Sequence, residues 1–206
     1  IVPIVEKIGE QKIVAMHWTG GYSFLHRPGG WAFAPLRGYA SHWAGFVEWA
    51  TANWKEQRKP RVVSSIFEGV AGKDIASVLD PWLRNNPKIE YAFGETMWHD
   101  PKPVDLSGYV RKLIKEGKPD YILSGPTSIS VSAFYSALRE LGFLDKVHIL
   151  NPNYQGLDVL AKMLGKDTLE GQYEANPIDF SPGTQANKIY MANIDKYAKG
   201  NPWGGV

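Results

Sequence analysis

The chain has 206 residues, of which 44% are hydrophobic and 21% charged, and this composition predicts a folded globular protein rather than a disordered one. Its 23 Lys and Arg residues nearly balance 21 Asp and Glu residues, so a net charge of +2 gives no basic surface for nucleic acid. The absence of cysteine excludes disulfides, cysteine-ligated zinc and thiol catalysis. Aromatic residues, at 13%, are unusually frequent, and no apolar run approaches the roughly 18 residues of a membrane helix.

The first part of the chain contains short apolar runs separated by loops rich in glycine and proline. Residues 13–16 predict a strand, and residues 31–34 predict a brief extended piece. From Tyr39 onward, large apolar side chains recur at helical spacing, and Pro60 closes this segment. We therefore expect a helix that leads into the rest of the chain.

Strand-like and helix-like segments alternate from there on. The predicted strands are 62–67, 89–93, 121–124, 147–150 and 171–175. One predicted helix begins near residue 72, and others cover 106–117, 131–141, 157–164 and 184–198. Asp105 is expected to cap the helix 106–117, and Gly117 is expected to end it in the left-handed conformation. Because such units cross over right-handedly, the alternation predicts an α/β fold with a doubly wound parallel sheet.

The motifs of nucleotide-binding and hydrolytic α/β proteins are absent. The sequence contains neither a G-x-x-x-x-G-K-[ST] loop nor a strand followed by G-x-G-x-x-G, and it lacks the G-x-S-x-G elbow. None of the five histidines shows H-E-x-x-H spacing. We therefore predict no cofactor, no metal site and no catalytic residue.

Ligands of doubly wound sheets bind in the loops at the carboxyl ends of the strands. In those positions the sequence has aromatic and small polar side chains, with Trp98 and His99 expected in a loop over 95–100. The candidate ligand-binding residues are Trp18, Thr19, Phe67, Glu68, Trp98, Thr127, Ser128, Asn153 and Tyr154. Apolar walls with neutral hydrogen-bonding groups suit recognition of a small molecule, whereas acid–base catalysis needs paired groups of tuned pKa. The set therefore favours binding over catalysis.

Several segments, in order and spacing, resemble the type I periplasmic binding proteins, and most of all the leucine/isoleucine/valine-binding type that feeds ABC transporters. The stretch 103–125 is similar to a family segment with a "k-P-D" run and a later glycine. The similarity continues in 134–142, 151–153 and 169–171, and in 67–76 with Gly72 in the family's glycine position. The resemblance implies two α/β lobes that close on a small ligand like a hinged clamp and then dock on a membrane permease.

The resemblance also implies how the chain is divided. Residues 1–34 would be the tail of the N-terminal lobe with the first crossing, and residues 35–178 would be the C-terminal α/β lobe. Residues 179–206 would begin the return segment towards the N-terminal lobe. We therefore expect a fragment that holds one lobe and part of a second.

Roles for particular residues follow from the same resemblance. The loop with Trp18, Thr19 and Gly20 would present a backbone carbonyl and the Thr19 hydroxyl to the ligand. Asn153 occupies the position of an acidic residue that pairs with the ligand's α-amino group, and an amide cannot supply that charge. Unless Glu68 takes over this role, we expect a small amide, an aromatic carboxylate or another organic solute stacked on Trp18 or Trp98, rather than a simple α-amino acid.

The function implied is that of a solute-binding protein of an ABC transporter, with a permease as partner and no enzymatic activity. Such a protein is periplasmic or extracellular, and its signal peptide is expected outside this chain. Its ligand would be a small organic solute that is branched-chain amino acid-like, an amide or an aromatic acid. Two alternatives stay open: a ligand-sensing regulator or receptor domain of the same fold, and an α/β hydrolytic enzyme that uses Ser124, His99 or Glu68.

Overall fold

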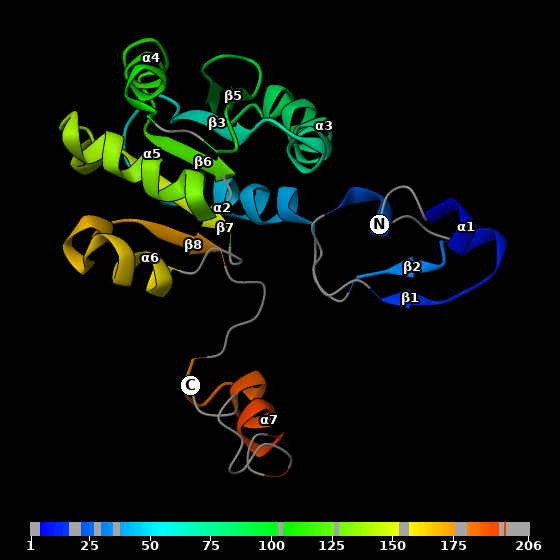
Figure 1. Ribbon diagram of the computed structural model, residues 1–206. Coiled ribbons are helices and arrows are strands. Elements are labelled where there is room, and N and C mark those ends of the chain that lie inside the picture. Colours follow the sequence, from blue (N-terminus) through cyan, green and yellow to red (C-terminus); the bar gives the residue numbers. More distant parts are fainter. Residues whose placement is uncertain are drawn as a thin grey trace. The chain divides into compact units, whose positions relative to one another are not determined.

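The structure is a computed structural model of the chain, and it describes residues 5–16, 22–26, 30–34, 38–102, 105–125, 128–152, 157–175, 181–193 and 196. The chain divides into two compact units, residues 1–175 and 176–206. Figure 1 shows that the described strands all belong to the first unit, whereas helix α7 belongs to the second.

The described elements alternate as the sequence predicts. The strands are β1 (Ala15–Met16), β2 (Ala32–Phe33), β3 (Arg61–Phe67), β4 (Glu90–Tyr91), β5 (Met97–His99), β6 (Tyr121–Gly125), β7 (His148–Pro152) and β8 (Tyr173–Ala175). The helices are α1 (Val5–Glu10), α2 (Tyr39–Asn53), α3 (Val70–Asn85), α4 (Ser107–Gly117), α5 (Ser128–Glu140), α6 (Leu157–Leu164) and α7 (Gln185–Asn193). Short 3₁₀ turns are η2 (Ser23–His26), η3 (Leu144–Lys146) and η4 (Lys166–Leu169).

The main sheet is parallel throughout, and its strand order is β4-β3-β6-β7-β8 with β5 also beside β3. The first half of β3 pairs with β4, and its second half pairs with β5 through Ser65↔Met97 and Phe67↔His99. The chain therefore winds outward on one side of β3 and then returns to wind outward on the other. This order confirms the predicted doubly wound sheet, and its switch point lies between β3 and β6.

Helices cover both faces of this sheet, as Figure 1 shows. Side chains of a strand alternate between the two faces, and β3 sends Val62 and Ile66 to one core and Val63 to the other. The first core contains apolar side chains of α2 and α3, and the second contains those of α4, α5 and α6. The result is three layers with two separate apolar cores, as expected when consecutive βα units bury one stripe of each helix.

The end of α4 differs from the prediction at one residue. Gly117 is the last residue of the helix, and the left-handed conformation belongs to Lys118, which has φ 42° and ψ 52°. Gly117 is needed for a different reason: a Cβ there would lie 2.8 Å from Cε2 of Phe93 and 3.1 Å from Cγ2 of Val63. The glycine allows close packing of α4 on β3, and it does not supply the turn.

The loop predicted over 95–100 is wrong, because residues 97–99 form β5. The preceding strand is correspondingly shorter than predicted and ends at Tyr91, before a turn in which Gly94 has φ 69°. Asp80 of α3 fixes this turn, since its carboxylate accepts hydrogen bonds from the Tyr91 hydroxyl at 2.7 Å and from the Thr96 hydroxyl at 2.7 Å. The turn that separates β4 from β5 at this edge of the sheet thus depends on the Asp80 side chain of α3. Local sequence patterns do not reveal such a contact.

The beginning of the chain forms a small parallel pair, in which Ala15 is opposite Ala32. Asp74 of α3 anchors this region, because its carboxylate accepts hydrogen bonds from the backbone N–H of Ser23 at 2.8 Å and from its hydroxyl at 2.7 Å. Among the helices that the structure describes, none has the length and apolar character needed to cross a bilayer.

Candidate functional site

The candidate site is built around the carboxyl ends of β3 and β6, at the switch point of the sheet. Phe67 is the last residue of β3, and α3 begins at Val70 after only Glu68 and Gly69. Such a short connection holds the start of α3 directly above the end of β3. The first turn of α3 and the side chains packed on it therefore form one wall of the site.

Two aromatic rings lie on this first turn because two glycines leave room for them. A Cβ on Gly69 would lie 3.0 Å from Cε2 of Phe67. One on Gly72 would lie 2.2 Å from the carbonyl oxygen of Phe67 and 3.2 Å from Cζ3 of Trp98, so Gly72 allows close approach of both the β3 backbone and the Trp98 ring. Trp98 is 38% exposed even though one side of its ring faces α3. The structure thus places Phe67 and Trp98 beside the start of α3, at the carboxyl ends of β3 and β5, and the exposed Trp98 ring remains available for stacking.

Trp98 and His99 reach this edge from a strand, which corrects their predicted placement in a loop. Trp98 is opposite Ile66 and His99 is opposite Phe67 in the β3–β5 register. A backbone hydrogen bond also joins the residue after β3 to the end of β5, since the N–H of Glu68 donates to the carbonyl of His99 at 2.8 Å. The Glu68 side chain itself is exposed, and its predicted role as a countercharge stays a prediction.

His99 is part of the core rather than a free side chain at the edge, since it is only 6% exposed. Its Nδ1 lies 2.9 Å from the carbonyl oxygen of Asp100, and its ring meets that of Tyr109 edge-on at 5.6 Å. Burial lowers the pKa of His99, and the nearby Asp100 offsets this only in part. The ring is therefore neutral at pH 7, with Nδ1–H donating to the carbonyl.

Below the edge lies a small set of buried hydroxyl groups. The Tyr109 hydroxyl is 2.8 Å from the hydroxyl of Ser65 and donates to the carbonyl of Met97 at 3.0 Å. Burial raises the pKa of Tyr109, so this phenol stays protonated. Ser124 is opposite Ser65 in the register and is 2% exposed, and no hydrogen bond joins it to a histidine or a carboxylate within the described residues. The Tyr109 hydroxyl thus joins α4 to β3 and β5, and the described hydroxyls show no arrangement for nucleophilic attack.

Asn151 lies just beyond the predicted strand 147–150, and the structure places it inside β7, fully buried. Its Nδ2 donates to the Tyr135 hydroxyl at 2.7 Å and to the carbonyl of Tyr173 at 3.3 Å. Its Oδ1 has no partner among the described residues and no access to water. Asn151 therefore fixes α5 and β8 to the carboxyl end of β7, immediately before the predicted ligand residues 153 and 154.

Several predicted site residues lie outside the described part of the chain. Ser128 opens α5, and nothing is described of its side chain. The others outside the described residues are Trp18, Thr19, Gly20, Thr127, Asn153 and Tyr154. Their assignment to the ligand stays a prediction.

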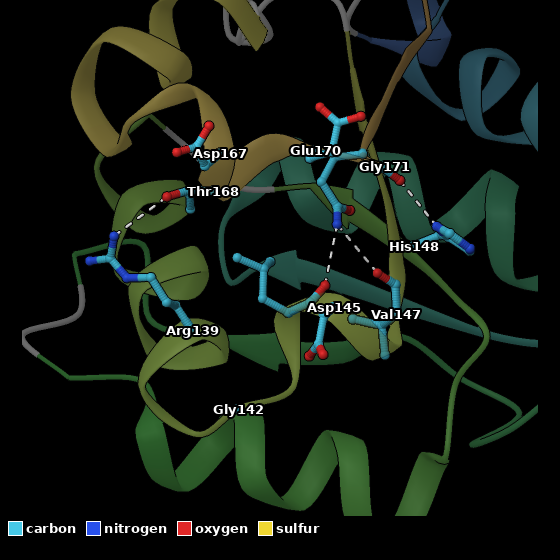
Figure 2. Close-up of a pocket in the computed structure, with 11 residues that line it drawn as sticks. Arg139, Gly142, Asp145, Val147, His148, Asp167, Thr168, Glu170 and Gly171 are labelled. Atoms are coloured by element: carbon cyan, nitrogen blue, oxygen red, sulfur yellow. Dashed lines mark hydrogen bonds between the residues drawn. The ribbon is translucent and has the colours of Figure 1, made fainter.

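A separate cavity of about 490 Å³ lies at the opposite edge, where β7 and β8 begin. In Figure 2, Arg139 and Thr168 lie on one side of it and His148 with Gly171 on the other. Arg139 reaches the Thr168 hydroxyl at 3.4 Å, and Nδ1 of His148 lies 3.1 Å from the Gly171 carbonyl oxygen. His148 is the exposed first residue of β7, whose other residues are buried. The described residues also contain no cluster of His, Asp and Glu suited to a metal ion.

No protein-family model and no curated protein matches the chain, whereas many solved structures match it. A possible leucine/isoleucine/valine-binding protein from Rhodopirellula baltica SH 1 has a TM-score of 0.76 at 15% identity, covering 98% of this chain and 53% of that one. A branched chain amino acid ABC transporter from Thermus thermophilus with bound valine has a TM-score of 0.72 at 16% identity, covering 95% and 49%. A fatty acid ABC transporter substrate-binding protein from Thermomonospora curvata has a TM-score of 0.71 at 20% identity, also covering 95% and 49%.

The chain thus spans about half the length of the solved structures that it matches. At this level of identity, the similarity establishes a shared fold, and function has to be argued from the site. The matches cover nearly the whole of the chain, and they include proteins of the group that the sequence resembles. The chain therefore has the fold of the type I periplasmic binding proteins and corresponds to about half of one, as the sequence resemblance predicted.

Proposed function

We propose that the chain forms the C-terminal lobe and part of the second lobe of an ABC transporter solute-binding protein, which acts outside the cytoplasm. The observation that carries the proposal is the presence of two aromatic rings, Phe67 and Trp98, beside the start of α3 at the carboxyl ends of β3 and β5, next to the switch point. In a doubly wound sheet this is where ligands bind. Delivery of the solute to a permease, and export, are parts of the proposal that are supported by the names of the similar structures.

The ligand we propose is an organic acid or amide with an apolar or aromatic body and without an α-ammonium group. The described part of the edge supports this, because it offers the exposed aromatic surface of Trp98. The described carboxylate at the switch point, Glu68, is exposed to water, which weakens its pairing with an ammonium group. The Thermomonospora neighbour is named for fatty acids, which are carboxylates of this kind.

Binding without chemical turnover fits the same residues. A hydrolytic site would need a nucleophile within hydrogen-bonding distance of a base. Ser124 is buried among strand residues, and the Nδ1–H of His99 is used by a backbone carbonyl. Neither group is arranged to attack a substrate at the edge.

Isothermal titration with matched ligand pairs tests the proposal in the natural protein that contains this chain. The pairs are 4-methylpentanoate with leucine and 3-phenylpropionate with phenylalanine, which differ only in the α-ammonium group. We expect the acid of each pair to bind at least about tenfold more tightly, since an unpaired ammonium in a closed cleft costs more than about 1.4 kcal/mol. If neither these pairs nor small amides bind, the transport proposal fails.

Two substitutions place the ligand on this lobe. Trp98→Ala should weaken binding of 3-phenylpropionate by about five- to tenfold, because it removes one stacking surface. Trp49→Ala is the matched control: Trp49 is 45% exposed on α2, where it contacts Phe46 and Tyr173 instead of the switch point. Tighter binding of the amino acids, lost in Glu68→Gln, would instead assign the ammonium to Glu68 and overturn the proposed ligand class.

A further inference from the structure

The first turns of α2 contain a histidine in an unusual environment. His42 is only 7% exposed, and both of its ring nitrogens lack a hydrogen-bond partner among the described residues and have no access to water. It belongs to the apolar stripe of α2, one turn before Phe46. Buried polar groups are nearly always hydrogen-bonded, so a ring with two unpartnered nitrogens calls for an explanation.

The surroundings of His42 are apolar and aromatic. Its ring meets that of Tyr39 edge-on at 6.1 Å, which places it beside the first residue of the helix. The next residue, Trp43, is completely buried, and its Nε1 also lacks a partner among the described residues. The Trp43 ring lies 3.0 Å from where a Cβ on Gly125 would be, at the carboxyl end of β6. The first turns of α2 are thus held by packing, without side-chain hydrogen bonds from these two residues.

Among the described residues of the elements packed on α2, no charged group compensates for this burial. The helix packs on α3, β7 and β8, and it also contacts Gly125 and Tyr121 of β6. On α3, the carboxylates of Asp74 and Asp80 hold Ser23 and Thr96, and Arg84 donates to the Gly94 carbonyl at 2.9 Å, while Lys73 is exposed.

The ionisable side chains of β7 and β8 likewise already have other contacts. On β7, His148 contacts the Gly171 carbonyl. On β8, Glu174 accepts a hydrogen bond from the N–H of Leu157, and Tyr173 packs on Phe46. Burial alone lowers the pKa of His42 from its ordinary value of 6.5, with no charged group acting on it.

We propose that the first turns of α2 are an acid-sensitive element, in which proton uptake by His42 releases residues 39–43 from the core while the rest of the lobe stays folded. An imidazolium cannot remain in this environment, because two unpartnered N–H donors and a positive charge would be buried without a countercharge. The ring therefore binds a proton only when it moves out into water.

The release is confined to the start of the helix because the following turn is anchored independently. The Phe46 ring contacts those of Tyr121 at 5.5 Å and Tyr173 at 5.4 Å, so α2 is tied to β6 and β8 one turn later. The proposed release of residues 39–43 does not depend on which solute is bound.

Hydrogen exchange read by mass spectrometry tests the proposal in the natural protein that contains this chain. Exchange is compared at pH 7.5 and 5.5, with times scaled for the intrinsic rate. Peptides that cover residues 38–46 should lose protection by up to about tenfold per pH unit below 6.5, as expected for uptake of one proton on opening. Peptides from β3 and β6 should keep their protection.

The variants separate His42 from the other imidazoles. His42→Phe should keep the protection of residues 38–46 at both pH values, whereas His148→Gln, at an exposed imidazole, should still lose it. Equal protection of the unmodified protein at both pH values, or a loss that persists in His42→Phe, contradicts the proposal. If His42→Phe does not fold, ¹⁵N-histidine spectra decide, since a protonated His42 signal at pH 5.5 together with intact α2 protection also overturns it.

Discussion

At the end of α4, Gly117 and Lys118 have different roles. Gly117 lacks a side chain because Phe93 and Val63 occupy the space where a Cβ would project. Lys118 turns the chain, with φ 42°, in a conformation that ordinary residues adopt only at a cost in free energy. Gly117 therefore provides the space for packing, and Lys118 provides the turn.

Substitutions at these two positions should have opposite effects on the stability of the fold. Lys118→Gly should stabilise the fold by about 0.5–1 kcal/mol, because glycine adopts the left-handed conformation without strain. Gly117→Ala should destabilise it by about 1–3 kcal/mol, because the new methyl group overpacks against Phe93. Urea unfolding monitored by circular dichroism measures both changes. A stabilising Gly117→Ala would show that the space beside Phe93 is not filled.

The environments of individual residues were also the least predictable part of the structure. Gly117 was expected to be a turn residue because glycine after a helical stripe indicates one, and the sequence does not show what faces its Cα. The predicted strand 147–150 ends before Asn151, whereas its hydrogen bond to the Tyr135 hydroxyl stabilises it inside β7. Both outcomes depend on partners 16 or more residues away, which a local pattern does not contain.

Among the elements, the interrupted strand β4–β5 depends most on a single side chain. Asp80 accepts hydrogen bonds from the hydroxyls of Tyr91 and Thr96 and from the N–H of Thr96 at 3.1 Å. Burial, together with the Asp80 carboxylate, raises the pKa of Tyr91, so its hydroxyl remains a donor at any physiological pH. The turn between β4 and β5 is therefore fastened to α3 by one carboxylate.

Removal of this carboxylate should loosen the edge of the sheet that carries Trp98. Asp80→Ala should cost about 2–4 kcal/mol, since hydrogen bonds to a charged group contribute about 1.5–3 kcal/mol each and do not add fully. Asp105→Ala is the matched control, and it should cost much less because the exposed Asp105 carboxylate accepts one N–H, that of Ser107 at the start of α4. Both free energies of unfolding come from urea titrations. Equal costs for the two variants would contradict the role of Asp80.

Elements with a clear apolar pattern were predicted correctly. The apolar residues of α4 recur at helical spacing, and β3 and β6 contain apolar runs of strand length. The structure confirms all three elements. β5 was missed because three residues following a glycine turn show neither alternation nor a continuous apolar run. Phe67 could be placed at the edge because it ends a clear strand, whereas Trp98 was assigned to the right edge in the wrong kind of segment.

At the scale of the whole fold, two buried imidazoles in the part of the chain that the structure describes link folding to pH. Burial lowers the pKa of both His42 and His99 below the ordinary 6.5. Between the folded-state pKa and 6.5, the unfolded chain therefore binds more protons than the folded one. The stability that this difference contributes is fully present above pH 6.5 and is lost as the pH falls below it.

Thermal unfolding from pH 8 to 5 should show this dependence. We expect a flat midpoint above about pH 7 and a decline below 6.5 with the slope of up to two protons. His42→Phe should reduce the slope by one proton, and the remaining slope is assigned to His99. A midpoint that is constant down to pH 5 would show that neither ring is held neutral by the fold.

The interrupted edge also bears on how the molecule behaves in concentrated solution. A long regular strand at the border of a sheet presents a row of backbone groups with which another chain can pair, and this is a common route to aggregation. Here the border next to β3 consists of two residues of β4, a turn and three residues of β5, so that a straight run long enough for such pairing does not form. The carboxylate of Asp80 maintains that break, and its loss should make the protein less soluble as well as less stable.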